Sequence, residues 1–234
     1  GARLAREGYA RALHKRRGAA ADPVLAEALA ETGTEHRSFA ADLADPAAVD
    51  ALIPAVVEAF GRAPDLLVNN AALFAEGEWS DLSAAALAEM IQINLSAPVM
   101  LAKALVAASN SARPAIVNIV DQRVAQPVPD QIAYSLSKSA LWQATATLAV
   151  AFGNRARVNA VAPGLTMATD DYSDAQVERL AKLMPLGVLP MPAQIADAVV
   201  YLARAEAATG QTIFVDGGAH PAPMGRAFRA LDRA

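Results

Sequence analysis

Residues 115–138, with the sequence AIVNIVDQRVAQPVPDQIAYSLSK, set the fold and the chemistry that we expect of this chain. The first six residues are mostly apolar and β-branched, a composition typical of a buried strand. Asp121 follows this strand at once, and a helical pattern begins near Ile132. The stretch therefore predicts a strand that ends at a carboxylate, then a loop, then a long helix.

The same alternation of short apolar strands and longer alanine- and leucine-rich helices extends along the whole chain. It is expected when crossover helices join the strands of a parallel sheet. Strands are expected at 10–14, 36–40, 65–69, 115–120, 157–161 and 212–215, and helices at 23–32, 46–60, 83–108, 132–152, 173–183 and 192–203. Asp22 and Asp45 precede proline at two helix starts and are expected N-caps. The sequence predicts one α/β domain over residues 1–234, a Rossmann-type, doubly wound parallel sheet flanked by helices.

The composition limits what the chain is expected to bind. A net charge of −4 gives no general attraction to nucleic acid or to an anionic membrane, so neither is an expected partner. There is no cysteine and the three histidines are scattered, which leaves no pattern of metal ligands. No apolar run reaches the roughly 18 residues that span a bilayer, and no secretory signal opens the chain. We expect a cytoplasmic protein with a small-molecule substrate and no metal centre.

Three of the predicted strands run into polar residues or into a Pro-Gly pair. Asn69 and Asn70 follow the apolar run 65–68, Asp121 follows 115–120, and Pro163 and Gly164 follow 158–162. Each taken alone is compatible with an ordinary turn. Ligands of open parallel sheets bind at the carboxyl ends of the strands, so together these residues predict a binding site at one edge of the sheet.

Tyr134 and Lys138 lie four residues apart at the start of a predicted helix, which places both side chains on one face. A neighbouring ammonium group stabilises a phenolate, and we expect Lys138 to lower the pKa of Tyr134 toward neutral pH. The pair can then donate or accept a proton. The same spacing also occurs on ordinary solvated helices. The residues around the pair therefore decide between a catalytic pair and a solvated helix face.

Those surroundings resemble the short-chain dehydrogenase family over nearly the whole chain. The ordered motifs that carry the resemblance are Asn69-Asn70-Ala71, Asn94 within IQIN, Tyr134-x-x-x-Lys138, VNAVAPG at 158–164 and VDGG at 215–218. The resemblance implies that Tyr134 is the catalytic acid and that Lys138 holds the nicotinamide ribose and tunes the tyrosine. It implies that Asn94 anchors a water leading to that lysine.

The family resemblance also implies a nicotinamide cofactor site. Asn70 and Ala71 would line it, Asp42 would contact the adenine, Pro163 and Gly164 would pass close to the nicotinamide, and Thr166 would reach the cofactor from the following loop. The family's glycine-rich fingerprint, which binds phosphate with backbone amides, is not found in the sequence. We expect the first strand and this loop to be missing at the N-terminus, with Gly1 a candidate for its last glycine.

The basic run His14-Lys15-Arg16-Arg17 follows the first predicted strand of this chain. Dehydrogenases that prefer NAD usually carry an acid at this point, whereas an arginine accommodates the 2′-phosphate of NADP. Three fixed positive charges favour a phosphate and offer bidentate contacts. The sequence predicts NADPH as the cofactor, and the alternative is a solvated basic turn.

Asp121 is the main departure from the family pattern, because 13 residues before the motif tyrosine the family usually has a serine. That serine donates a hydrogen bond to a substrate carbonyl, whereas an ionised carboxylate repels a developing alkoxide. A carboxylate instead accepts hydrogen bonds from ring N–H groups. The predicted reaction is therefore reduction of a C=N bond in a nitrogen heterocycle, with Asp121 and Tyr134 handling protons at the substrate.

An aspartate at this position resembles pteridine reductases and the related dihydromonapterin reductases. Phe74 lies four residues after Asn70, where those enzymes carry an aromatic ring that sandwiches the pterin against the nicotinamide. Phe74 is thus an expected substrate-binding residue, and core packing is the alternative. Ala72 departs from the pattern, since a serine often stands there.

Two other readings of the function stay open. One is a carbonyl or alcohol oxidoreductase that tolerates Asp121, and the other is a catalytically idle cofactor-binding regulatory protein. The span 165–192 is either a substrate lid or a surface excursion, and the tail 220–234 either covers a neighbouring subunit or frays. Core or interface packing is expected of Trp79, Trp142 and Tyr172. Small residues on 83–108 and 132–152 allow close helix packing, and the family commonly forms dimers and tetramers.

Overall fold

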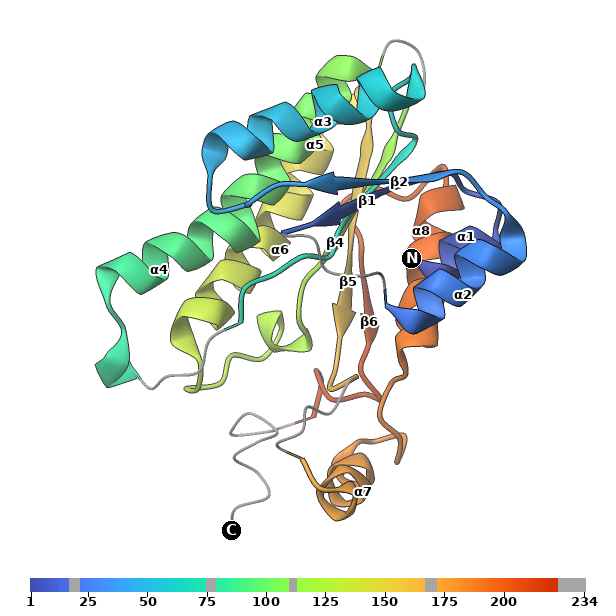
Figure 1. The fold of residues 1–234 in the computed structure, drawn as a ribbon. Helices are drawn as coiled ribbons and strands as arrows, with labels where there is room; N and C mark the ends of the chain where they lie inside the picture. The colour runs from blue at the N-terminus through green and yellow to red at the C-terminus, as the bar shows by residue number, and fades with distance from the viewer. Residues whose placement is uncertain (17–21, 75–78, 110–112, 167–171, 223–234) are drawn as a thin grey trace.

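The chain forms one α/β domain in the computed structural model, which describes residues 1–16, 22–74, 79–109, 113–166 and 172–222 (Figure 1). The strands are β1 (Arg11–Lys15), β2 (His36–Ala40), β3 (Leu66–Asn69), β4 (Ala115–Ile119), β5 (Arg157–Pro163) and β6 (Thr212–Val215). The α-helices are α1 (Ala2–Arg6), α2 (Pro23–Thr32), α3 (Pro46–Phe60), α4 (Ala84–Ile91), α5 (Ala97–Ala108), α6 (Ile132–Phe152), α7 (Asp174–Leu183) and α8 (Pro192–Arg204). Short helical turns are η1 (Trp79–Asp81), η2 (Gln92–Ser96), η3 (Gln122–Val124) and η4 (Gly153–Arg155). Arg17 and parts of the predicted lid and tail lie outside the described residues.

All described strand pairs are parallel, as the alternation of strands and helices predicts. Strands β3, β4, β5 and β6 form one sheet in that order, and β1 pairs with β2 in a second. Leu66 lies opposite Ala115, and Ala115 opposite Arg157, so the carboxyl ends of β3, β4 and β5 meet at the same edge. The sequence prediction of a parallel sheet with its polar residues gathered at one edge is confirmed.

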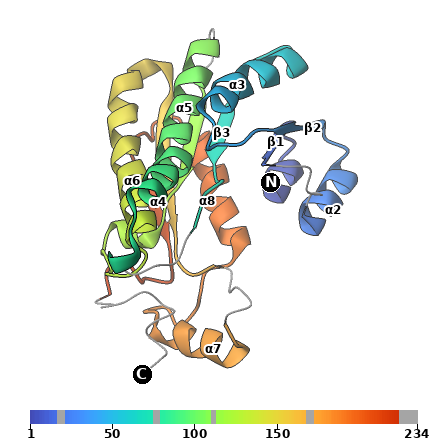
Figure 2. The ribbon, with the colours of Figure 1, turned by 60° about the vertical axis from the view of Figure 1, so that its left-hand side comes forward.

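Helices cover both faces of the sheet, which confirms the doubly wound architecture. Helices α3, α4, α5 and α6 lie on one face, and α1, α2 and α8 lie on the other (Figure 2). Helix α6 packs on β5, α5 on β3, and α8 on β4, β5 and β6. Because βαβ crossovers place helices on both faces, the central strands are buried and almost continuously apolar.

The helix boundaries follow from capping residues that the sequence already shows. The Asp22 carboxylate accepts hydrogen bonds from the backbone N–H groups of Val24 and Leu25, and that of Asp45 accepts one from Ala47. Both N-cap predictions are confirmed. Gly33 and Gly61 end the corresponding helices in the left-handed conformation that glycine adopts without strain.

Residues 84–108 form one continuous helical run with a π-helical turn, η2, in its middle. By length and composition alone this run could cross a membrane, which differs from the sequence expectation that no apolar run is long enough. Half of its most apolar window is buried inside the domain, where α5 packs against α3 and the sheet. Leu101 and Leu105 join Ile116 and Val158 in the largest apolar cluster, so the run is a core helix of this domain.

Arg157 is a buried cation that stabilises the end of α8. Its guanidinium donates to the backbone carbonyls of Leu202, Ala203 and Ala205 at 2.6–2.8 Å, which are among the last carbonyls of the helix and its cap. Such carbonyls have no partner within a helix. Arginine thus satisfies them and opposes the negative end of the helix dipole.

We predict that Arg157→Met lowers the free energy of unfolding by about 3 kcal/mol, because it leaves buried carbonyls without donors. Urea denaturation followed by circular dichroism measures this change. Arg155→Met is the matched control, since Arg155 also donates to helix-end carbonyls but is exposed, and it should change stability by less than about 0.5 kcal/mol. Equal effects of the two substitutions would contradict the role assigned to Arg157.

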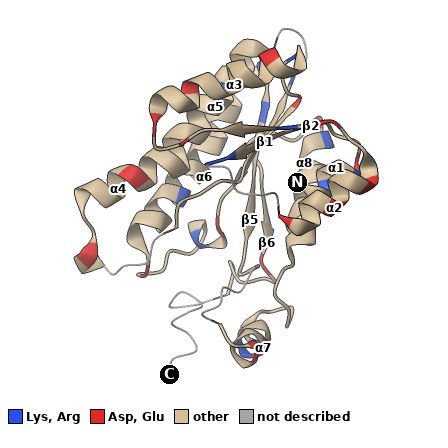
Figure 3. Ribbon diagram, in the orientation of Figure 1, with Lys and Arg blue, Asp and Glu red and all other residues tan. Residues whose placement is uncertain are grey.

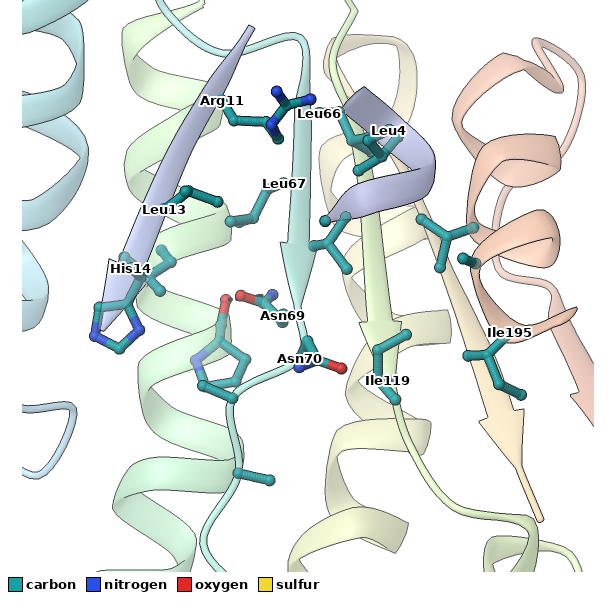
Figure 4. A pocket seen from close by; sticks show the side chains of 18 of the residues that line it. Leu4, Arg11, Leu13, His14, Leu66, Leu67, Asn69, Asn70, Ile119 and Ile195 are labelled. Carbon is teal, nitrogen blue, oxygen red and sulfur yellow. Dashed lines mark hydrogen bonds between the residues drawn. The ribbon is translucent and has the colours of Figure 1, made fainter. Parts of the chain in front are cut away.

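A cavity of about 1280 Å³ lies between the two sheets and continues to the carboxyl ends of β3 and β4. Within the described residues no strand pairing joins β1 to β3, and side chains of both strands line the space, among them Leu13, Leu66 and Leu67 (Figure 4). Arg11 also borders it, and its buried Nε is without a hydrogen-bond partner in the described structure. Among the described residues the sheet is thus divided between β1 and β3.

Candidate active site

The polar residues predicted at the strand ends line the same cavity. Asn70 and Ala71 follow β3, Asp121 follows β4, and Pro163 and Gly164 end and follow β5. The cavity also reaches His14, Phe74, Tyr134, Lys138 and Thr166. Lys15, Arg16, Asp42 and Asn94 are not among the residues that line it.

Asp121 and Tyr134 form the polar centre of this cavity. The Tyr134 hydroxyl donates to Asp121 Oδ2 at 3.3 Å. The carboxylate is also held by Arg123, whose Nε donates to Oδ1 and whose Nη2 donates to Oδ2, both at 3.0 Å. The Asp121 and Arg123 side chains are only 17% and 12% exposed, so this ion pair is largely shielded from water. A proton donor and a carboxylate acceptor therefore lie side by side.

Tyr134 is a weaker acid in this structure than the sequence predicts. Burial and then the negative charge of Asp121 raise the pKa of Tyr134 well above its usual value, against an opposing effect of Arg123. Lys138 Nζ lies 5.8 Å from the centre of the tyrosine ring. The expectation that Lys138 lowers the pKa of Tyr134 is wrong for this state, because burial dominates the tyrosine.

Lys138 is almost fully buried on the first turns of α6. Its ammonium donates to the carbonyl of Ile119 at 2.8 Å, which fixes it beside the end of β4. Burial lowers the pKa of Lys138 to about 8, although Asp121 acts in the opposite direction. The lysine is therefore poised to lose its proton a little above neutral pH.

Asn94 lies in the π-helical turn η2, a type of turn that often occurs at functional sites. Its side-chain amide accepts from the backbone N–H of Leu73 at 2.7 Å and donates to the Leu73 carbonyl at 2.8 Å. It also donates to Ser137 Oγ at 3.0 Å, next to Lys138. The Asn94 side chain thus links the loop after β3 to helix α6 by hydrogen bonds.

Phe74 stands on the wall of the cavity rather than in the core. The residue is 51% exposed, and its ring meets that of Tyr134 edge to face with a centroid distance of 4.9 Å. The loop that carries it is fixed by Asn94 through Leu73. The core-packing alternative is therefore wrong, because the exposed ring lines the cavity.

The basic end of β1 is coloured blue in Figure 3, and His14 at this end lines the cavity. The His14 imidazole Nε2 lies 2.9 Å from the carbonyl oxygen of Ala41, and Arg16 pairs with Asp42 at 3.4 Å in an exposed ion pair. Asp42 also caps its own turn by accepting from the backbone N–H of Ala44. This carboxylate therefore holds Arg16 in the structure.

Gly164 is needed for close packing at the end of β5. A Cβ built at this position would lie 2.8 Å from Asp216 Cα and 2.9 Å from Asp216 Cβ. Thr166 Oγ1 donates back to the carbonyl of Gly164 at 2.9 Å, which shapes the loop that leaves the strand. The VDGG and VNAVAPG motifs therefore contact each other across adjacent strands, and of the two it is VNAVAPG, through Pro163 and Gly164, that lines the cavity.

Arg123 and Gln131 belong to the site, and sequence reasoning did not select them. The Gln131 side-chain oxygen accepts a hydrogen bond from Arg123 Nη1. The guanidinium of Arg123 also lies over the Tyr134 ring, 5.1 Å from its centroid. An arginine two residues after Asp121 was visible in the sequence, but the direction of its side chain was not.

A family model described as enoyl-(acyl carrier protein) reductase matches residues 2–220. The chain belongs to the short-chain dehydrogenase/reductase family, and is therefore an oxidoreductase by family. It is 34% identical over 190 residues to D-threitol dehydrogenase of Mycolicibacterium smegmatis, covering 78% of this chain and 73% of that protein. It is 34% identical over 206 residues to the 3-oxoacyl-[acyl-carrier-protein] reductase of Synechocystis, covering 85% and 81%.

Among solved structures, the chain is similar to FolM alternative dihydrofolate reductase 1 from Brucella canis, complexed with NADP. The TM-score is 0.84 at 35% sequence identity, and the match covers 94% of this chain and 87% of that chain. The relatives that share the fold thus include both carbonyl or alcohol enzymes and a reductase named for a pterin-type substrate.

Proposed function

We propose that this protein is an NADPH-dependent reductase that reduces the C=N bond of a pterin-like heterocycle. The observation that carries the proposal is the pair formed by the Tyr134 hydroxyl and Asp121 Oδ2, 3.3 Å apart beside the exposed Phe74 ring. A donor next to an acceptor matches a substrate edge on which an acceptor nitrogen and an N–H group are neighbours. Similarity to an alternative dihydrofolate reductase supports the same substrate class.

The residues of the cavity fit a nicotinamide dinucleotide. His14 borders it at the carboxyl end of β1, with Lys15 and Arg16 next in the chain, and an arginine at this position suits a 2′-phosphate. At the other end, Lys138 would hold the nicotinamide ribose, while Pro163 and Gly164 line the cavity and Gly164 adds no side chain to the wall. When bound, the reduced nicotinamide supplies the hydride. Solved relatives complexed with NADP support the choice of phosphate-bearing cofactor.

The space between β1 and β3 is proposed to take a parallel strand followed by a glycine-rich loop. Both strands present an unpaired edge to this space in the described structure, and a strand between them would join the two sheets into one. A backbone carbonyl of that strand would also satisfy the buried Nε of Arg11. The expected loop would then lie at the ends of β1 and β3, next to His14 and Asn70.

Tyr134 is proposed to deliver the proton of the reduction. The hydride would add to the carbon of the C=N bond, and the nitrogen would take the proton from the Tyr134 hydroxyl. Asp121 Oδ2 would accept the substrate's neighbouring N–H and so orient the ring for this transfer. Lys138 Nζ, held by Ile119, keeps a positive charge near the developing phenolate of Tyr134.

Phe74 is proposed to set the plane of the substrate. Its ring lies against the edge of Tyr134, is half exposed to the cavity, and belongs to a loop that Asn94 fixes. A flat heterocycle that stacks on Phe74 would present its edge to Tyr134 and Asp121. An aliphatic ketone would use this surface poorly.

Carbonyl reduction is a second candidate that one observation favours. Arg123 neutralises the Asp121 carboxylate through two hydrogen bonds, so the site carries less negative charge than the sequence suggests. Repulsion of a developing alkoxide is correspondingly weaker. The names of several relatives, including the Synechocystis reductase, belong to carbonyl chemistry.

A substrate panel tests the proposed function. NADPH oxidation would be followed with dihydropterins, dihydrofolate, a β-ketoacyl thioester and simple ketones. The proposal expects kcat/KM for at least one dihydropterin to exceed that for every ketone. Turnover of ketones alone would establish the carbonyl reading, and tight NADPH binding without oxidation of any substrate would establish a non-catalytic role.

The pKa of Lys138 predicts an alkaline limit to activity. Because burial lowers this pKa to about 8, the ammonium group is present below that pH and is lost as the pH rises through it. The pH profile of kcat/KM, which reports groups of the free enzyme, should therefore fall above about pH 8. In Lys138→Arg the residual activity should keep its plateau to higher pH, since a guanidinium does not lose its proton there. If kcat/KM falls at the same alkaline pH in both proteins, the group that titrates is not Lys138.

A further inference from the structure

Arg123 makes three separate sets of contacts around the reacting groups. Its Nε and Nη2 form a fork on the two oxygens of Asp121, its Nη1 donates to Gln131 Oε1, and its guanidinium lies over the Tyr134 ring. Its backbone N–H also donates to Asp121 Oδ1 at 2.9 Å. Exposed surface ion pairs rarely have such a set of partners, whereas planar bidentate pairs are specific in geometry.

Gln131 fixes the outer side of the guanidinium by an unusual backbone conformation. Among the described residues it is the one non-glycine residue with positive φ, at φ 54° and ψ 52°. It occupies the N-cap position of α6 but makes no capping bond there with its side chain. Instead the amide oxygen turns to Arg123. Left-handed backbone at a non-glycine residue persists only where its surroundings hold it. Here the Gln131 side chain accepts a hydrogen bond from Arg123.

The Asp121 carboxylate is fully occupied as a result. Oδ1 accepts from the backbone N–H and Nε of Arg123, while Oδ2 accepts from Nη2 of Arg123 and from the Tyr134 hydroxyl. A carboxylate has about four acceptor sites. The bond from Tyr134 is the longest of the four at 3.3 Å, so a substrate N–H can most easily replace that one.

We propose that Arg123 is a positioning residue that presents one oxygen of Asp121, Oδ2, to the substrate and frees the Tyr134 hydroxyl for proton transfer when a substrate N–H takes its place. This inference rests on the proposed function. Three of the five guanidinium N–H groups of Arg123 donate to Asp121 and Gln131, so its side chain is bound mainly to these two residues, and it acts through Asp121. Without the Arg123 side chain, the carboxylate keeps, among its described partners, only the backbone N–H of residue 123 and the Tyr134 hydroxyl, and is less firmly oriented.

A double-mutant cycle tests this role. The proteins are the unchanged chain, Arg123→Met, Asp121→Asn and the double variant, with kcat and KM measured for the dihydropterin that the wild-type protein reduces. If Arg123 acts through Asp121, Arg123→Met lowers kcat by about tenfold or more in the original background and by less than about threefold beside Asp121→Asn. KM for NADPH should stay within about twofold. Equal losses in both backgrounds, or no loss in either, would overturn the inference.

Two further variants separate positioning from folding. Gln131→Ala removes the outer support but leaves both charges, and it should lower kcat by several-fold in the original background and not beside Asp121→Asn. Arg123→Lys keeps the charge without the fork and should restore only part of the rate. Thermal unfolding identifies variants that fail to fold. If an Arg123 variant fails to fold, the test rests on Gln131→Ala measured in the original background and beside Asp121→Asn. Arg37→Met, on an exposed ion pair with Glu35, is the neutral control.

Failure of the proposed function would look different. If the wild-type protein reduces ketones and no dihydropterin, the substrate assignment fails, and the same four proteins measured on the ketone still decide whether Arg123 acts through Asp121. If dihydropterins are reduced and the losses in kcat from Arg123→Met and Asp121→Asn simply add, the proposed function stands and the proposed role of Arg123 is wrong.

Discussion

Tyr134→Phe is expected to lower kcat for dihydropterin reduction by about 10²- to 10⁴-fold, the usual contribution of a positioned general acid. The substitution removes the hydroxyl that donates to Asp121 Oδ2 and leaves the ring that packs against Phe74. NADPH binding should change little, because the ring and the neighbouring Lys138 keep their places. Stopped-flow measurement of NADPH oxidation under single-turnover conditions isolates this step from product release.

Tyr201→Phe is the matched control for this loss, since Tyr201 is a largely exposed tyrosine on α8. It should retain full activity. A Tyr134→Phe protein that folds, binds NADPH and turns over at more than about a tenth of the normal rate would show that another group donates the proton. The burial-raised pKa of Tyr134 agrees with a residue that is protonated, and hence able to donate, across the neutral range.

Asp121→Ala is expected to lower kcat/KM for the dihydropterin by about 10- to 100-fold, the value of one lost hydrogen bond to a charged acceptor. The loss should fall mainly on substrates with an N–H beside the reducible bond, so a ketone should lose less. The variant also leaves the Arg123 guanidinium, which is 12% exposed, without its counter-charge. The free energy of unfolding should then fall by about 3 kcal/mol.

Asp121→Ser is the companion variant because it places at this position the residue that the family usually has. Its ratio of ketone to dihydropterin turnover should rise relative to the original protein. Asp50→Ala, at an exposed position on α3, controls for the loss of a carboxylate elsewhere. If Asp121→Ala lowers ketone and dihydropterin reduction by the same factor, Asp121 does not select the substrate.

Much of the fold was predictable because its signals are local. Asp22 and Asp45 cap helices at the residues where the sequence places them, and helices α2, α3 and α6 have the predicted bounds. Strands β2 and β6 also have the predicted bounds. The other strands differ by one or two residues at an end; β5, for example, continues to Pro163 because it still pairs with β6 there. The π-helical turn inside residues 84–108 was not predicted, because nothing in its apolar pattern marks the extra residue in the turn.

The site was predictable only in part. Parallel strands bring their carboxyl ends together, so the placement of Asn70, Asp121 and Gly164 along one cavity follows from topology. The pKa of Tyr134 did not follow, because burial and the charge of Asp121 depend on packing that sequence spacing does not contain. The fork of Arg123 on Asp121 and the left-handed backbone of Gln131 are likewise long-range consequences of the folded loop.

The most direct test of the central claim follows the hydride itself. NADPH deuterated at the transferred position would be incubated with the protein and a dihydropterin, and the product would be examined by NMR and mass spectrometry. The account predicts one deuterium on the ring carbon of the former C=N bond, with the new N–H proton taken from solvent through Tyr134. A pterin recovered without deuterium, while a ketone in the same mixture gains the label at its carbinol carbon, would contradict it.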